Sequence, residues 1–195
     1  MDKNIILGNL ITAVSMLENC RDFSSLIPEV RVNVAYALPD AKTRQDIAAI
    51  DGRITSVHGW PRASGMPAFG ASDHMARLII ESRKYDLQIN AGINFKCDET
   101  IIAVVKQYCS YNNLSFGWIN RTQEPAEVIA HDGTSMPWKI AELVNTSGGK
   151  MPRLFYEGEG WGKEPLFVAV GNDVIAVTTI AIEIAHAYQQ KIMAI

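Results

Sequence analysis

The residues with the clearest chemical potential lie in segment 70–74, which reads Gly-Ala-Ser-Asp-His and leads into the expected start of a helix. Backbone N–H groups at a helix start attract anions such as phosphate. Arg77 follows His74 by three residues, so both side chains are expected on one face of that helix. The positive end of the helix dipole favours a neutral histidine, which suits hydrogen bonding or proton transfer. The segment predicts an anion site, and the alternative is an ordinary capped helix start with a surface histidine.

Two other places could bind an anion. Arg53 follows Asp51-Gly52 at the expected beginning of a strand, where its planar guanidinium could hold a phosphate through two hydrogen bonds. Most arginines in such positions are solvated or form salt bridges. Segment 157–165 reads Glu-Gly-Glu-Gly-Trp-Gly-Lys-Glu-Pro, so its glycines allow close backbone approach and Lys163 supplies positive charge. Taken alone, that segment is more often a plain hairpin loop.

Other classes of catalytic site find no support in the sequence. The four histidines form neither an H-x-H nor an H-E-x-x-H pattern, which disfavours a zinc hydrolase or a zinc aldolase. The three cysteines show no C-x-x-C spacing, so no disulfide framework is expected and a reducing, cytoplasmic location fits best. No G-x-S-x-G nucleophile motif is present. We therefore expect no dedicated metal centre and no organic cofactor.

The composition is that of an ordinary folded protein. The chain has 195 residues and a formal net charge of −3, which argues against nucleic acid as the main partner. This length predicts a single domain over residues 1–195. The N-terminus lacks the features of a signal peptide. Polar residues interrupt the longest apolar stretch, 174–187, so no membrane segment is expected.

Periodic apolar residues predict the helices that position these groups. Apolar residues recur at helical spacing from Ile6 to Leu17. Ser72 can cap a helix whose buried side includes Met75 and Leu78. Further helices are expected over 43–50, after Asp98, over 137–144 and, capped by Asn172, in the C-terminal part of the chain.

Strands are expected between these helices. Strict alternation over 30–36 predicts a half-buried strand with Val30, Val32 and Val34 on one face. Further strands are expected at 53–57, 87–95, 114–119, 153–156 and 166–170. Two prolines and two glycines within 60–72 predict an irregular loop. About six strands interleaved with these helices indicate an α/β sandwich, and the short connections favour a mixed sheet.

Several short blocks follow one another in order over nearly the whole chain. They are Leu26-Ile27-Pro28-Glu29-Val30, Asn33-Val34-Ala35-Tyr36-Ala37, Asp46-Ile47-Ala48-Ala49, Gly52-Arg53-Ile54, Phe69-Gly70-Ala71-Ser72, His74, Ala76-Arg77, Asn94 and Gly162-Lys163-Glu164-Pro165. Together they resemble one family, the archaeal-type thiamine-phosphate synthases of the ThiN type. The blocks are specific as a set.

The resemblance implies a fold and a reaction. The fold would be a three-layer α/β/α domain with a mixed, largely antiparallel sheet, similar to the class II aldolase (AraD-like) fold. The zinc-binding histidines of those aldolases are not found here, in agreement with the scattered histidines. The reaction would join hydroxymethylpyrimidine diphosphate to hydroxyethylthiazole phosphate, giving thiamine phosphate and diphosphate.

The resemblance also assigns roles to residues. The arginine of the Gly-Arg-Ile block and the histidine after Gly-Ala-Ser are expected to be catalytic, here Arg53 and His74. Residues expected to bind the phosphorylated pyrimidine and thiazole substrates are Asn33, Gly70, Ala71, Ser72, Arg77, Asn94, Lys163 and Glu164. Magnesium is expected to accompany the diphosphate leaving group, without a carboxylate cluster that identifies its ligands.

The resemblance is also compatible with roles other than a synthase. The family also occurs as a ligand-binding domain fused to a DNA-binding module, and as the C-terminal part of a fusion with a pyrimidine kinase, so a fused or lost kinase domain is one expectation here. A non-catalytic sensor of thiamine phosphate is the main alternative to a synthase. A sugar-phosphate aldolase on the same fold is disfavoured by the missing metal histidines. Exposed sheet edges in such domains favour a symmetric homodimer.

Overall fold

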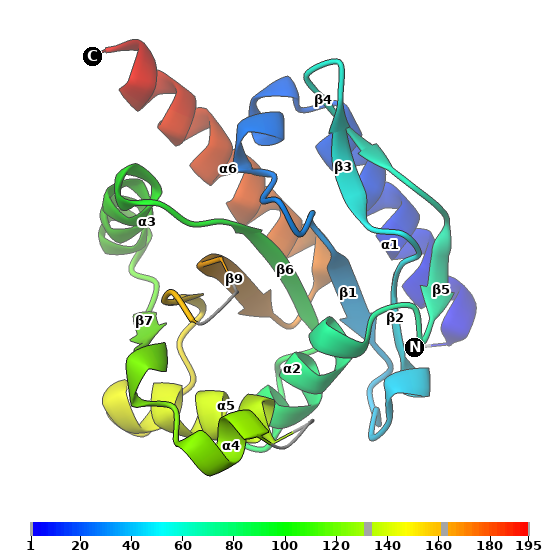
Figure 1. Cartoon of the computed structure of the whole chain (residues 1–195). Coiled ribbons are helices and arrows are strands. Elements are labelled where there is room, and N and C mark those ends of the chain that lie inside the picture. Colours follow the sequence, from blue (N-terminus) through cyan, green and yellow to red (C-terminus); the bar gives the residue numbers. More distant parts are fainter. Residues whose placement is uncertain (1, 131–133, 161–163, 195) are drawn as a thin grey trace.

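The computed structural model describes residues 2–130, 134–160 and 164–194 (Figure 1). Its centre is a seven-stranded sheet in the order β5-β2-β1-β6-β9-β8-β7, and β3 and β4 form a separate hairpin. The strands are β1 (Val34–Ala37), β2 (Ile47–Ile50), β3 (Ile54–Val57), β4 (Trp60–Ala63), β5 (Pro67–Phe69), β6 (Ala91–Lys96), β7 (Phe116–Ile119), β8 (Leu154–Glu157) and β9 (Leu166–Gly171). Neighbouring strands are antiparallel except β7 and β8, so the expected mixed, largely antiparallel sheet is confirmed.

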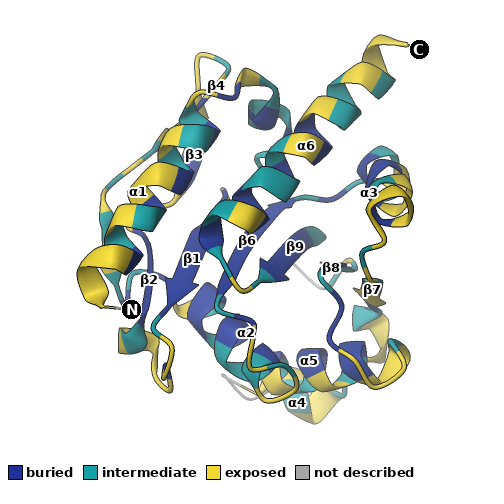
Figure 2. Cartoon of the chain, turned by 180° about the vertical axis from the view of Figure 1, so that it is seen from behind, coloured by how far each residue is buried: buried dark blue, intermediate teal, exposed yellow. Residues whose placement is uncertain are grey.

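Helices cover both faces of this sheet. They are α1 (Lys3–Glu18), α2 (Asp73–Arg83), α3 (Glu99–Asn112), α4 (Ala126–Ala130), α5 (Ser135–Thr146) and α6 (Val174–Met193). Buried residues of α1, α3 and α6 form one apolar core with the sheet, and those of α2 and α5 form a second core on its other face. Figure 2 shows buried positions of α1 and α6 turned toward the strands. The expected three-layer α/β/α architecture is therefore confirmed.

Capping residues start the helices where the sequence predicts. The Ser72 hydroxyl accepts a hydrogen bond from the Met75 N–H at 3.3 Å, and Asp98 accepts one from the Ile101 N–H at 2.8 Å. α6 begins one residue later than expected, because Asp173 rather than Asn172 caps it. Among the described residues, no helix combines the length and apolar character needed to cross a membrane.

The predicted half-buried strand over 30–36 is wrong in two respects. Arg31 has a positive φ of 68°, which is incompatible with a continuous strand, and β1 begins only at Val34. Val30 is 42 % exposed. β1 pairs with β2 on one side and β6 on the other, and helices cover both faces, so all four of its residues are buried. The alternation with Arg31 and Asn33 reflects the approach to the strand rather than the strand itself.

Two further segments differ from prediction. The Thr43–Asp46 capping box exists, but it closes only a 3₁₀ turn at Arg44–Asp46, and the four apolar residues that follow form the buried strand β2. Within 60–72 the chain forms β4 and β5 instead of an irregular loop. Prolines fit there because both strands have an unpaired side. The strand predicted over 87–95 starts at Ala91, and Leu87 is 76 % exposed.

Candidate active site

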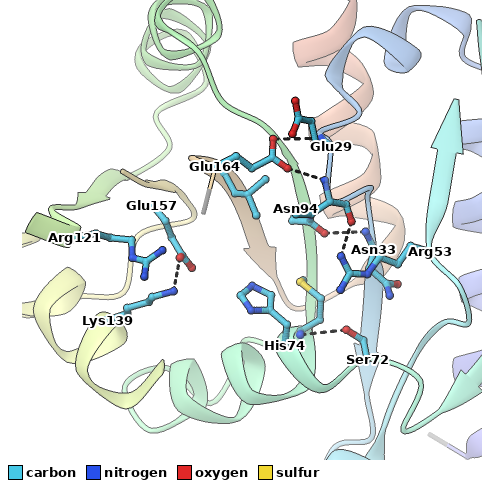
Figure 3. A pocket seen from close by; sticks show the side chains of 13 residues that line it. Glu29, Asn33, Arg53, Ser72, His74, Asn94, Arg121, Lys139, Glu157 and Glu164 are labelled. Carbon is cyan, nitrogen blue, oxygen red and sulfur yellow. Dashed lines mark hydrogen bonds and ion pairs between the residues drawn. The ribbon is translucent and has the colours of Figure 1, made fainter. Parts of the chain in front are cut away.

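A cavity of about 370 Å³ opens beside β1, β6 and the start of α2 (Figure 3). It contains six of the ten residues that the sequence assigned to the site: Asn33, Arg53, Ser72, His74, Asn94 and Glu164. These residues come from five separate segments of the sequence, so the fold brings distant positions to one place. Their roles in binding or catalysis remain predictions.

Arg53 lies at one side of this cavity, at the base of the β3–β4 hairpin. Gly52 and Arg53 both have positive φ values, of 71° and 68°, which turn the chain sharply into β3. The Arg53 guanidinium donates a hydrogen bond to the Val30 carbonyl. Val32 and Ile54 exchange two backbone hydrogen bonds of 3.1 and 2.8 Å, which attach the hairpin next to the cavity. These contacts hold an exposed cation at the cavity rim.

His74 occupies the first turn of α2, directly after the capping Ser72. Figure 3 shows its ring between Arg53 on one side and the Lys139–Glu157 pair on the other. Met75, the next residue, is buried in the core beneath the cavity. The helix start thus presents an imidazole into the middle of the cavity, where it can reach a bound anion.

Asn33 and Asn94 form the wall between β1 and β6, and their side chains hold backbone groups. The Asn33 amide donates to the Ile50 carbonyl at 3.1 Å, and its carbonyl oxygen accepts from the Ile50 N–H at 2.9 Å. The Asn94 carbonyl oxygen accepts from the Asn33 N–H at 2.8 Å, and its amide donates to the Arg31 carbonyl at 3.1 Å. The Asn33 side chain thereby extends the β1–β2 ladder and shapes the cavity.

Replacing Asn33 by alanine is expected to lower the free energy of unfolding by about 2 kcal/mol or more, because two buried backbone groups of Ile50 lose their partners. Chemical denaturation measures this change. Asn145→Ala on the exposed side of α5 is the matched control, and it should stay within about 0.5 kcal/mol of the parent. Equal stability of the Asn33 variant and the parent would show that this ladder extension is unimportant.

Glu164 closes the cavity from the segment that leads into β9. Its carboxylate accepts hydrogen bonds from the backbone N–H groups of Glu29 and Val30, at 3.2 and 2.7 Å. This contact ties the approach to β9 to the approach to β1. Lys163, its predicted neighbour in the site, lies outside the described residues.

Gly70, Ala71 and Arg77 are not among the residues that line the cavity. The Gly70 and Ala71 N–H groups already donate to backbone carbonyls, at 2.9 and 3.4 Å, so two of the amides expected to cradle phosphate have partners within the protein. Arg77 forms a 2.9 Å ion pair with Asp73 on the surface of α2. The structure does not bring these three residues to the cavity, and their part in binding stays a prediction.

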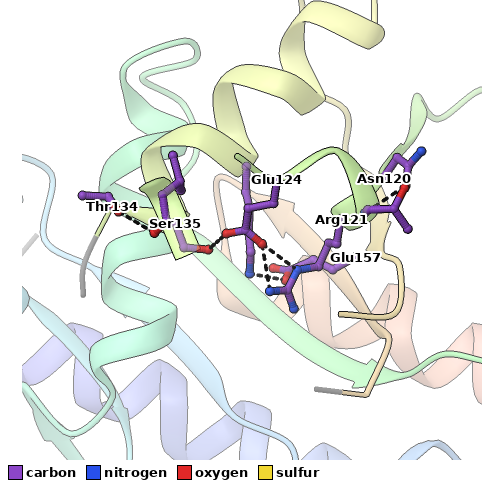
Figure 4. A network of polar contacts seen from close by, with 9 residues as sticks. Asn120, Arg121, Glu124, Thr134, Ser135 and Glu157 are labelled. Carbon is purple, nitrogen blue, oxygen red and sulfur yellow. Dashed lines mark hydrogen bonds and ion pairs between the residues drawn. The ribbon is translucent and has the colours of Figure 1, made fainter. Parts of the chain in front are cut away.

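A group of buried charges on the opposite wall was not predicted from the sequence. Lys139 and Glu157 form a 2.5 Å ion pair, with side chains only 5 % and 6 % exposed. Arg121 and Glu124 form a second pair at 3.0 Å, and the Ser135 hydroxyl donates to Glu124 (Figure 4). Arg121, Lys139 and Glu157 all line the cavity. Buried charges of this kind persist only when they are paired and hydrogen-bonded.

One signal for this network was present in the sequence. Lys139 lies on the same side of α5 as Met136, Ile140 and Leu143, so a charged residue interrupts an apolar stripe. Glu157 begins the glycine-containing segment 157–165 that is predicted to bind an anion, but no sequence pattern predicts a role for its carboxylate. The proximity of Arg121 to these residues depends on the parallel pairing of β7 with β8, which no local pattern reveals.

Electrostatics keep both buried carboxylates ionised. Burial alone raises the pKa of Glu157, but the neighbouring Lys139 and His74 outweigh it and lower that pKa below its ordinary value. Burial likewise opposes ionisation of Glu124, and hydrogen bonds from Ser135 and Arg121 bring its pKa below the usual range. The cavity therefore has a cation at its rim and an ionised carboxylate within its opposite wall.

Comparisons with known proteins identify relatives over most of the chain. The family model described as thiamine-phosphate synthase ThiN matches residues 9–183. Thiamine-phosphate synthase ThiN of Methanothermobacter thermautotrophicus is 35 % identical over 183 residues, which cover 94 % of both chains. The bifunctional thiamine biosynthesis protein ThiDN of Methanocaldococcus jannaschii is 32 % identical, over 91 % of this chain and 40 % of that protein.

Solved structures differ in how closely they superimpose on this chain. The C-terminal domain of a phosphomethylpyrimidine kinase superimposes with a TM-score of 0.89 and 28 % identity, covering 94 % of this chain and all of that domain. L-fuculose-1-phosphate aldolase from Thermus thermophilus aligns only weakly, with a TM-score of 0.48 and 10 % identity over 95 % of each chain. On the family match and the identity to the Methanothermobacter protein, this chain belongs to the thiamine-phosphate synthase ThiN family.

Proposed function

We propose that this chain is a thiamine-phosphate synthase, a transferase that joins hydroxymethylpyrimidine diphosphate to hydroxyethylthiazole phosphate and releases diphosphate. Family membership supports this proposal. The observation that carries it is the convergence of Arg53 and His74 in one cavity, although 21 residues separate them in the sequence (74 − 53). Both substrates are anions, and a cation at the cavity rim suits them.

In this reaction the bonds break and form between the two substrates, with little covalent participation by the protein. The bond between the pyrimidine methylene carbon and the diphosphate oxygen breaks, and its electron pair leaves with the diphosphate. The ring amino group donates electron density to the methylene, whose carbon is then captured by the lone pair of the thiazole nitrogen. In this scheme Arg53 stabilises the charge that develops on the departing diphosphate, and His74 donates a hydrogen bond to a phosphate oxygen. Alignment of the two rings supplies the remaining acceleration.

Magnesium remains part of the proposal as a companion of the diphosphate. Among the described residues, no three His, Cys, Asp or Glu side chains are grouped so that they could hold a metal ion. In the cavity, Glu164 accepts two backbone N–H groups and Glu157 is paired with Lys139. A protein-only magnesium site does not fit these residues. Magnesium usually keeps several waters and binds substrate phosphates, which requires no such site.

A direct assay tests the proposed function. Purified protein is incubated with both phosphorylated precursors, and thiamine phosphate is quantified against a reaction without protein. Parallel reactions contain magnesium or a chelator. We expect catalytic turnover, with activity dependent on the cation. If no product forms under any of these conditions although thiamine phosphate raises the melting temperature, the synthase proposal fails and the chain is a sensor of thiamine phosphate.

Two expectations about the cellular state accompany the proposal. We expect the protein in the cytoplasm, where small phosphorylated precursors are made. A symmetric homodimer stays a prediction from the exposed sheet edges, here β5 and β7. Sedimentation velocity at working concentration measures the mass, and a monomer would contradict the dimer.

A further inference from the structure

The wall of the cavity opposite Arg53 carries an acceptor that the described residues leave available. The Glu157 carboxylate is 6 % exposed and lines the cavity. Its Oε2 atom receives the Lys139 ammonium at 2.5 Å. In residues 2–130, 134–160 and 164–194, no hydrogen bond reaches its other oxygen, Oε1. Figure 3 shows this carboxylate facing the cavity beside Lys139.

Two other carboxylates in and near the cavity, those of Glu164 and Glu124, are already occupied, and Glu29, which also lines the cavity, is exposed to solvent. Both oxygens of Glu164 accept backbone N–H groups. Glu124 accepts the Ser135 hydroxyl on Oε1 and the Arg121 guanidinium on Oε2. Glu157 differs because Lys139 satisfies only one of its oxygens. A buried ionised carboxylate whose second oxygen receives no donor from the described residues favours a ligand that brings an N–H or O–H donor.

On the proposed function, only one substrate offers a suitable uncharged donor. The thiazole ring of hydroxyethylthiazole phosphate has no N–H group, whereas the pyrimidine carries an exocyclic amino group with two. We propose that the Glu157 carboxylate binds this amino group and thereby selects and orients the aminopyrimidine substrate. This inference rests on the proposed synthase function and adds a residue that specifies one of its two substrates.

The lining of the cavity suits a pyrimidine whose amino group points toward Glu157. Met75 and Leu166 supply apolar lining next to the charged groups, which suits the faces of an aromatic ring. His74 lies between Glu157 and Arg53 in Figure 3. A pyrimidine whose amino group contacts Glu157 can therefore extend its methylene past His74, with the diphosphate toward Arg53.

The same contact would also assist the chemistry. As the bond to diphosphate breaks, the amino group donates electrons to the methylene and gains positive charge. Its hydrogen bond to an ionised carboxylate then strengthens, so Glu157 stabilises the transition state more than the bound substrate. Lys139 has the supporting role of keeping this carboxylate charged and fixed in position.

Binding measurements test the contact without turnover. Hydroxymethylpyrimidine monophosphate and an analogue with hydrogen in place of the amino group are titrated calorimetrically into the parent protein and its variants. We expect the parent to bind the amine at least about tenfold more tightly, which corresponds to one charge-assisted hydrogen bond. In Glu157→Gln this preference should fall to about threefold or less. Glu99→Gln is the matched control, because Glu99 is exposed on α3 and does not line the cavity, and it should retain the preference of the parent.

A second variant keeps the test usable if Glu157→Gln does not fold. Lys139→Met combined with Glu157→Met removes both buried charges together, a change that folded proteins commonly tolerate. This double variant should stay folded by circular dichroism and should show no preference for the amine. A tenfold preference retained in either Glu157 variant, or no preference in the parent, would overturn the role of Glu157. If the parent discriminates through Glu157 but makes no thiamine phosphate, the proposed function fails and the amine contact stands.

Discussion

Replacing either Arg53 or His74 by alanine is expected to lower kcat by about 10²-fold or more while leaving the fold intact. Arg53 is exposed at the cavity rim and packs into neither core, and His74 lies on a helix that alanine favours. Each variant therefore loses stabilisation of the diphosphate charge rather than structure. Steady-state formation of thiamine phosphate gives kcat, and circular dichroism with thermal unfolding checks the fold.

Arg62→Ala is the matched control for the arginine. Arg62 belongs to the same hairpin, on β4, but it does not line the cavity. Its guanidinium donates to the carbonyls of Glu18 and Pro61 instead. The control should turn over at a rate close to that of the parent. Near-normal kcat in Arg53→Ala or His74→Ala would remove that residue from the mechanism.

Replacing Lys139 by methionine is expected to lower the free energy of unfolding by about 3–5 kcal/mol at neutral pH, because Glu157 would keep a buried charge without its principal partner. Urea denaturation at pH 7 measures this change. Lys150→Met is the matched control, since Lys150 is exposed, and it should shift the free energy by less than about 0.5 kcal/mol. A Lys139 variant as stable as the parent would show that the pair contributes nothing.

The contribution of Glu157 to stability should change with pH in opposite directions in the parent and in Lys139→Met. In the parent the folded-state pKa of Glu157 is lowered, so its contribution to stability is present above the unfolded pKa of about 4.3 and is lost as pH falls through the folded value. In Lys139→Met, burial acts with less opposition and should raise the folded pKa above the unfolded one. The penalty of the variant is then largest near pH 7 and shrinks as pH falls toward 4. A penalty that is constant with pH would contradict this account.

Elements with strong local signals could be predicted from the sequence. Ser72 and Asp98 start α2 and α3 as expected, because an N-cap hydrogen bond forms between neighbours in the sequence. Prediction failed where pairing between strands that are distant in the sequence determines the secondary structure. Residues 47–50 follow a helical capping box, yet they become a buried strand because β1 and β5 lie on either side. Tertiary pairing here outweighs a local preference.

The same distinction applies to the site. Arg53 and His74 belong to recognisable sequence blocks, and both lie in the cavity. Arg121, Lys139 and Glu157 come together only because β7, β8 and α5 pack side by side, and their charges are spread over three segments without a motif. For Arg77 a local pattern was not enough. Its spacing from His74 fits a shared helix face, but its guanidinium pairs with Asp73 outside the cavity.

The order of strands in the sheet also bears on how the chain folds. β6 pairs with β9 although about seventy residues separate them, and α6 packs against α1 from the far end of the described sequence. During synthesis, the edge of β6 that pairs with β9 and the part of α1 that packs against α6 must therefore remain uncovered until residues 166–193 have emerged from the ribosome. Such non-local closure slows folding, so refolding from denaturant should take milliseconds to seconds rather than microseconds.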